Sequence, residues 1–141
     1  MAEDLRVIIK LARHEVDERR RALAALFEQE QAVVDRQQAL ARELQTEQDV
    51  AAQDATGVGY LYGAYHLRYV QRRDSLAAAL AEVRAAIDGA RDLLAESFRQ
   101  LKTYEVAQAQ RERREREEAE HKERIFLDEV GQIAHQRHQT E

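Results

Sequence analysis

The chain has 141 residues, enough for one domain, and contains five glycines and no proline, cysteine or tryptophan. Sheets and folds with many corners need turns, and turns usually need glycine and proline, so this composition argues against such folds. Abundant alanine, leucine, glutamate, arginine and glutamine instead favour long helices or a coiled coil.

Charge and missing residue types exclude several functional classes. The net charge is −5 at pH 7 and the two signs are interleaved, unlike the net basic face of most nucleic-acid-binding proteins. Without cysteine there is no disulfide, thiol catalysis or cysteine-ligated zinc. No stretch approaches about 18 consecutive apolar residues, and residues 1–20 lack the pattern of a secretory signal. We therefore expect neither nucleic-acid binding nor insertion into a membrane.

A first helix is predicted over about residues 3–53. It carries an apolar seam with alternating steps of four and three residues, the repeat of a coiled-coil helix. The apolar seam positions are Leu5, Ile9, Ala12, Val16, Leu23, Leu26, Val33, Leu40, Leu44 and Ala51. Polar residues on the same steps often fix the register of a coiled coil. These are Arg19, Glu30, Gln37 and Glu47.

Residues 54–59 interrupt this pattern and predict one tight turn. Gly57 or Gly59 can adopt the left-handed conformation that ends a helix. A second helix is expected over about residues 60–138, with a seam of the same steps. Its positions are Tyr69, Arg73, Leu76, Leu80, Val83, Ile87, Ala90, Leu94, Ser97, Leu101 and Tyr104.

The two seams and the turn agree with an antiparallel hairpin. In such a hairpin, the residue numbers of two facing positions always add up to the same value. With a sum of 113, the seam residues of the first helix face those of the second, as Leu26 faces Ile87. The midpoint falls inside the predicted turn, and Leu5 would face Gln108, where the second helix loses its apolar residues. We predict an all-α fold: one helical-hairpin domain over residues 1–141, monomeric, with the second helix overhanging the first. A domain-swapped dimer of hairpins stays possible.

The overhang, residues 109–141, is mostly charged. Alanine is the only apolar residue type over 108–124, and opposite charges four residues apart, such as Glu112 and Arg116, support a solvated helix. Residues 125–134 are amphipathic and have no partner within the hairpin. They are a candidate partner-binding segment, with a frayed tail as the open alternative.

No motif in the chain predicts catalysis, and we expect no catalytic, cofactor-binding or metal-binding residues. A phosphate-binding glycine loop and a nucleophile elbow are both absent. His135 and His138 could share one helix face, but a metal usually needs three or four ligands, so solvated histidines are the favoured interpretation. The run 19–21 is all arginine, yet acidic residues lie beside it, and a solvated charged face is favoured over phosphate binding.

Tyrosines gather at the start of the second helix, at positions 60, 62, 65 and 69. Exposed aromatic side chains at the end of a hairpin can anchor a partner. They can equally wrap the hairpin end and shield the turn, and the sequence leaves both interpretations open.

Three stretches of the sequence resemble the FliJ family of the bacterial flagellar type III export apparatus. Residues 11–23 read LARHEVDERRRAL, residues 98–105 read FRQLKTYE as in alphaproteobacterial members, and residues 127–130 read LDEV before a tail rich in histidine and arginine. Together with the tyrosines after the turn, the resemblance covers nearly the whole chain. Injectisome stalk proteins of the same type are an open alternative.

The resemblance implies a central stalk made of an antiparallel coiled coil. Members of the family are thought to engage the hexameric export ATPase, promote its assembly and activity, contact the cytoplasmic domain of the export gate and escort export chaperones. The implied location is the cytoplasm, at the export machinery of the inner membrane.

Geometry and family behaviour together give candidate contact residues. The expected contacts with the ATPase ring are Arg6, Arg13, Arg20, Arg99 and Lys102. The expected contacts with the gate are Tyr65, Tyr69, Arg72 and Leu76. Two other functions stay open: a generic coiled-coil chaperone or adaptor, and a structural rod that associates with itself through residues 125–134 or through swapped helices.

Overall fold

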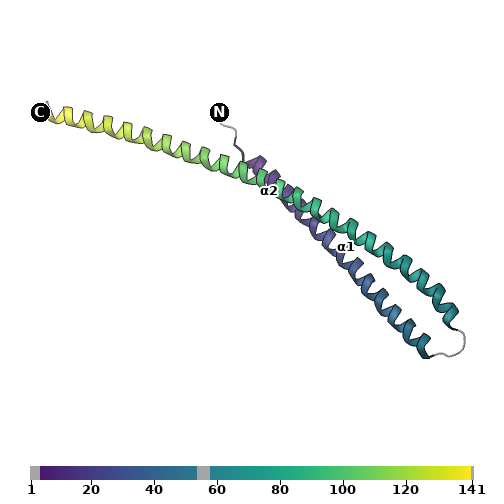
Figure 1. Ribbon diagram of the computed structural model, residues 1–141. Helices are drawn as coiled ribbons and strands as arrows, with labels where there is room; N and C mark the ends of the chain where they lie inside the picture. The colour runs from purple at the N-terminus through teal and green to yellow at the C-terminus, as the bar shows by residue number, and fades with distance from the viewer. Residues whose placement is uncertain (1–3, 54–57, 141) are drawn as a thin grey trace. The chain divides into compact units, whose positions relative to one another are not determined.

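The computed structural model describes residues 4–53 and 58–140, with the backbone alone for 58–62. It contains helix α1 (Arg6–Gln53) and helix α2 (Val58–Gln139), and no strand occurs among the described residues (Figure 1). The prediction of an all-α fold with two long helices packed against each other is confirmed. Part of the predicted turn, residues 54–57, lies outside the described residues, whereas Val58 and Gly59 belong to α2.

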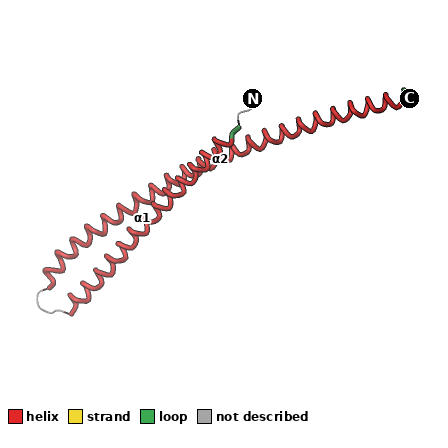
Figure 2. The backbone as a smooth tube through the Cα atoms, turned by 180° about the vertical axis from the view of Figure 1, so that it is seen from behind, coloured by secondary structure: helices red, strands yellow, loops and turns green. Residues whose placement is uncertain are grey.

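The start of α1 and the end of α2 are each closed by side-chain hydrogen bonds. At the start of α1, Asp4 Oδ1 accepts a hydrogen bond from the backbone N–H of Arg6, over 3.2 Å. At the end of α2, the Thr140 hydroxyl donates to the carbonyl oxygens of Gln136 (3.2 Å) and Arg137 (3.0 Å). Figure 2 shows the non-helical stretch before α1 and continuous helix through the described part of α2.

The chain divides into two compact units, each crossed by both helices. The first, here called the loop unit, is Glu15–Ser97 and holds most of α1 with the first half of α2. The second, here called the terminal unit, joins the start of α1, up to His14, to the part of α2 from Phe98 onward.

The core of the loop unit is a single seam between α1 and α2. Val16 and Ile87 are each only 3% exposed, and Val33 and Leu40 are also buried. Ion pairs across the seam match the register with a sum near 113: Glu30 with Arg84 at 3.3 Å and Glu43 with Arg72 at 3.6 Å. Each seam position is thus buried against only one opposing helix.

Two polar positions on the seam steps turn out to be exposed. Arg73 extends away from the seam, and its Nη2 lies 3.2 Å from Asp74 Oδ1. Glu47 is exposed as well, near the end of α1. The other seam positions are buried or half-buried wherever their side chains are described.

In the terminal unit the seam ends where α1 begins, because α2 continues beyond that point without a facing helix. Ile9 and Leu101 are buried, and the backbone N–H of Leu5 donates to Gln108 Oε1 over 3.1 Å. All described residues from 112 onward are exposed. Along this part of α2, Gln108 donates to Glu112 and Arg113 pairs with Glu117 at 3.1 Å, so Glu112 takes a partner other than the expected Arg116.

Replacing Ile87 with alanine should lower the free energy of unfolding by about 2–4 kcal/mol, because it removes a buried side chain from the seam. The matched control is Leu93→Ala, also on α2 but 48% exposed, which should change stability by about 0.5 kcal/mol or less. Urea unfolding followed by circular dichroism measures both. Equal losses in the two variants would contradict the burial pattern.

Candidate functional site

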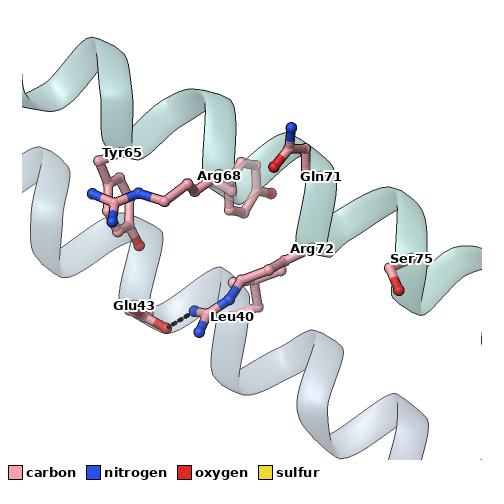
Figure 3. Close-up of a pocket in the computed structure, with 8 residues that line it drawn as sticks. Leu40, Glu43, Tyr65, Arg68, Gln71, Arg72 and Ser75 are labelled. Atoms are coloured by element: carbon pink, nitrogen blue, oxygen red, sulfur yellow. Dashed lines mark ion pairs between the residues drawn. The ribbon is translucent and has the colours of Figure 1, made fainter.

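Two adjoining grooves lie between α1 and α2 in the loop unit. The larger has a volume of about 510 Å³ and is shown in Figure 3. Its lining residues are Leu40, Glu43, Tyr65, Arg68, Tyr69, Gln71, Arg72 and Ser75. The smaller, of about 380 Å³, shares Leu40, Glu43, Arg72 and Ser75 and adds Arg36, Ala39 and Leu76.

The larger groove follows from helical spacing and from weaker packing toward the loop. Tyr65, Arg72 and their neighbours in the lining recur every three or four residues, which places them along one side of α2. On α1 the described residues beyond Leu44 are exposed, apart from half-buried Ala51.

The lining of the grooves combines two tyrosines and several apolar side chains with charged residues that are mainly basic. Arg72 Nη1 reaches across to Glu43 Oε2 at 3.6 Å, the ion pair drawn in Figure 3. Glu43 is the one acidic residue in either lining, against Arg36, Arg68 and Arg72. Such a surface suits a protein segment that offers a carboxylate beside an apolar or aromatic side chain.

The aromatic side of the larger groove is partly ordered by packing. The hydroxyl oxygen of Tyr65 is shielded from solvent, and the rings of His66 and Tyr69 stack with centroids 6.1 Å apart. Because rigid aromatic side chains lose little conformational freedom on binding, they are favoured as interface anchors. The side chains of Tyr60 and Tyr62 lie outside the described part of the chain.

The residues expected to contact the gate lie together around these grooves. Tyr65, Tyr69 and Arg72 line the larger one, and Leu76 with Arg72 lines the smaller one. Tyr69 and Leu76 are half-buried and also belong to the seam.

Sequence reasoning missed the groove residues Glu43, Arg68, Gln71 and Ser75. The predicted register could have identified Glu43. Its number and that of Arg72 add to nearly 113, so the two charges lie opposite each other across the hairpin.

The residues expected to contact the ATPase ring divide between the two units. In the terminal unit, Arg13 and Lys102 both approach Glu105, at 3.5 and 3.9 Å, and Arg6 pairs with Asp4 at 3.4 Å. Arg99 lies in the same unit and is exposed. Arg20 lies in the loop unit, where it pairs with Asp17 at 3.9 Å.

Other candidate chemistry gains no geometric support. Among the described residues no group of three or more His, Cys, Asp or Glu side chains is placed to hold a metal ion. A ring nitrogen of His135 lies 3.1 Å from Gln139 Nε2, and Arg19 of the arginine run bonds Glu15 at 2.9 Å. Over the same residues, neither helix has a stretch long and apolar enough to cross a membrane.

Comparison with known proteins gives no match among family models, curated proteins or solved structures.

Replacing Arg72 with alanine should lower the free energy of unfolding by only about 0.2–1 kcal/mol, because its side chain is 65% exposed and its pair with Glu43 is hydrated. The loss should shrink in about 1 M salt, which screens the pair. Leu40→Ala, at a buried position in the same groove, should cost about 2–4 kcal/mol at either salt concentration. Urea unfolding at two salt concentrations checks both expectations, and a salt-independent loss at Arg72 would contradict them.

Proposed function

We propose that this chain is a non-enzymatic component of the flagellar type III protein export apparatus, acting as a stalk like FliJ. In this role it engages the hexameric export ATPase and promotes the assembly and activity of the ring. It also contacts the cytoplasmic domain of the export gate and escorts export chaperones. The observation that carries the proposal is the antiparallel pair of long helices in one register, built from residues that resemble that family.

The charges outside the seam support binding to a ring. Arg6, Arg13 and Lys102 are all exposed, with side chains 65% to 75% accessible. Their present partners are carboxylates in hydrated pairs, which are individually weak and exchange readily for carboxylates of another protein. Binding through such groups is sensitive to salt.

The grooves of the loop unit support a separate contact with the gate. They combine a half-buried tyrosine pair with exposed arginines, the residue types that most often dominate binding energy at interfaces. The grooves lie in the loop unit, whereas every expected ring contact except Arg20 lies in the terminal unit, so the proposal assigns the gate and most of the ring contacts to different parts of the chain. The role places the protein in the cytoplasm, peripheral to the export machinery at the inner membrane.

Adding the chain to the purified export ATPase of the same organism should stimulate ATP hydrolysis and ring assembly, and higher salt should weaken both. A variant with Arg6→Glu and Lys102→Glu should raise the concentration for half-maximal stimulation by about three- to ten-fold, because two attractive contacts become repulsive. The control is Arg113→Glu with Arg124→Glu, a matched charge change outside the proposed contacts. No stimulation well above micromolar concentration, together with binding to many unfolded proteins, would favour the chaperone alternative.

The double variant Tyr65→Ala with Arg72→Ala should retain its helix content and lose about ten-fold or more in affinity for the cytoplasmic domain of the export gate. Both side chains line the larger groove, so the loss reports on that surface. The control is Leu67→Ala with Arg73→Ala, two exposed residues of the same helix that line neither groove. Calorimetry or fluorescence anisotropy measures the affinities, and equal binding by the two double variants would remove the groove from the proposal.

A further inference from the structure

An exposed apolar stripe runs along the end of α2. Phe126, Val130 and Ile133 are 61%, 46% and 53% exposed, although each is a side chain that usually packs. They continue in steps of four and three through Ala119, Glu123 and Arg137, and we call these six positions the C-terminal stripe. Among the described residues of the terminal unit, nothing covers them, since every position from 112 to 140 is exposed.

A hole of coiled-coil type is formed by three stripe positions together with Ala134 beside them. Val130, Ile133, Ala134 and Arg137 stand at the spacing i, i+3, i+4, i+7, which forms the hole that receives one side chain of a facing helix. With His138 these residues line a depression of about 320 Å³. The facing side chain must tolerate both an apolar wall and two basic groups.

The spacing between successive stripe positions is four, three, four, three and four residues, which is the same from either end. A second copy running antiparallel therefore matches every stripe position with a stripe position. Phe126 then faces Val130 of the second copy, Glu123 faces Ile133, and Ala119 faces Arg137. In this arrangement Glu123 of the second copy enters the hole, with its aliphatic part on Ile133 and its carboxylate toward Arg137.

Charge selects this orientation. In the antiparallel pair, Arg137 of each chain faces Ala119 of the other and lies beside Glu123, one turn along the stripe, so opposite charges meet at both ends of the stripe. In a parallel pair, Glu123 would face Glu123 and Arg137 would face Arg137, and like charges across a seam are unfavourable. A foreign helix needs a complementary pattern that nothing in the chain specifies, whereas a second copy supplies it.

We propose that the C-terminal stripe of this chain pairs antiparallel with the same stripe of a second copy. The interface uses no residue of the loop unit and none of the basic residues assigned to the ATPase ring. It is short, so the association is weak and depends on protein concentration.

Sedimentation of the full chain from about 1 to about 500 µM tests the proposal, with the mass expected to rise from 16.3 kDa toward twice that value. Val130→Glu should raise the dissociation constant by about ten-fold or more, because it places a charge at the apolar centre of the stripe. The matched control is Ile125→Glu, also 46% exposed in the native chain but off the stripe, which should change it by less than about two-fold. Circular dichroism checks that both variants keep their helix content.

A charge exchange tests the orientation. Glu123→Arg alone and Arg137→Glu alone should each weaken the pair by about three- to ten-fold, and the double variant should restore it. Three results would overturn the proposal. These are a constant 16.3 kDa species at all concentrations, equal association of the Val130→Glu variant and the native chain, and a double variant weaker than either single one. The second result would place the contact elsewhere, as in swapped hairpins, and the first would leave the stripe to a different protein.

Discussion

The seam between two helices, with no third layer against it, is the constraint on which this molecule depends. A helix that packs against a single neighbour can cover each seam side chain from one direction only. Accordingly, no large side chain among the described residues is less than 2% exposed, and even Ile87 and Val16 retain 3%. Stability is therefore spread along the length of the seam, and most of the surface of both helices is left for other contacts.

The same constraint explains how polar residues fit inside the seam. Arg19 is half-buried, yet its Nε lies 2.9 Å from Glu15 Oε1 one turn earlier, at the edge of the seam. Glu30 is half-buried and meets Arg84 across the seam at 3.3 Å. In a core of several layers such charges would lose their hydration, whereas here each reaches the solvent edge with its stem on apolar neighbours. The pair of Glu30 with Arg84 joins the two helices and therefore favours one register over registers shifted by a heptad, whereas the pair of Arg19 with Glu15 lies within α1.

Much of this arrangement was predictable because the heptad repeat is local and the register is arithmetic. Once both seams and the turn were read, the pairing of Leu5 with Gln108 followed, and the structure joins these residues by a hydrogen bond of 3.1 Å. The exposure of Arg73 was not predictable from spacing alone, which put it on the seam; its guanidinium instead lies 3.2 Å from Asp74 Oδ1. The grooves were only partly predictable. Periodicity placed Tyr65 and Arg72 on one side of α2, but the volume of the larger groove depends on how the side chains pack beyond Leu44, where most described residues of α1 are exposed.

The C-terminal stripe differs from the seam in its repeat as well as in its exposure. Counting heptads from Leu101 leads to residue 129, one position before Val130, so the stripe is out of step with the seam. In a supercoiled helix with 3.5 residues per turn, positions seven residues apart lie on the same side of the helix. A helix without a partner is not supercoiled and has about 3.6 residues per turn, so positions seven residues apart are rotated by about 20° around its axis. Over the 22 residues from Gln108 to Val130, where α1 no longer accompanies α2, this drift brings the stripe to within about 40° of the side of α2 that carries the seam. The offset thus fits a helix that is supercoiled where α1 accompanies it and straight beyond Gln108, where all described residues but Arg111 are exposed.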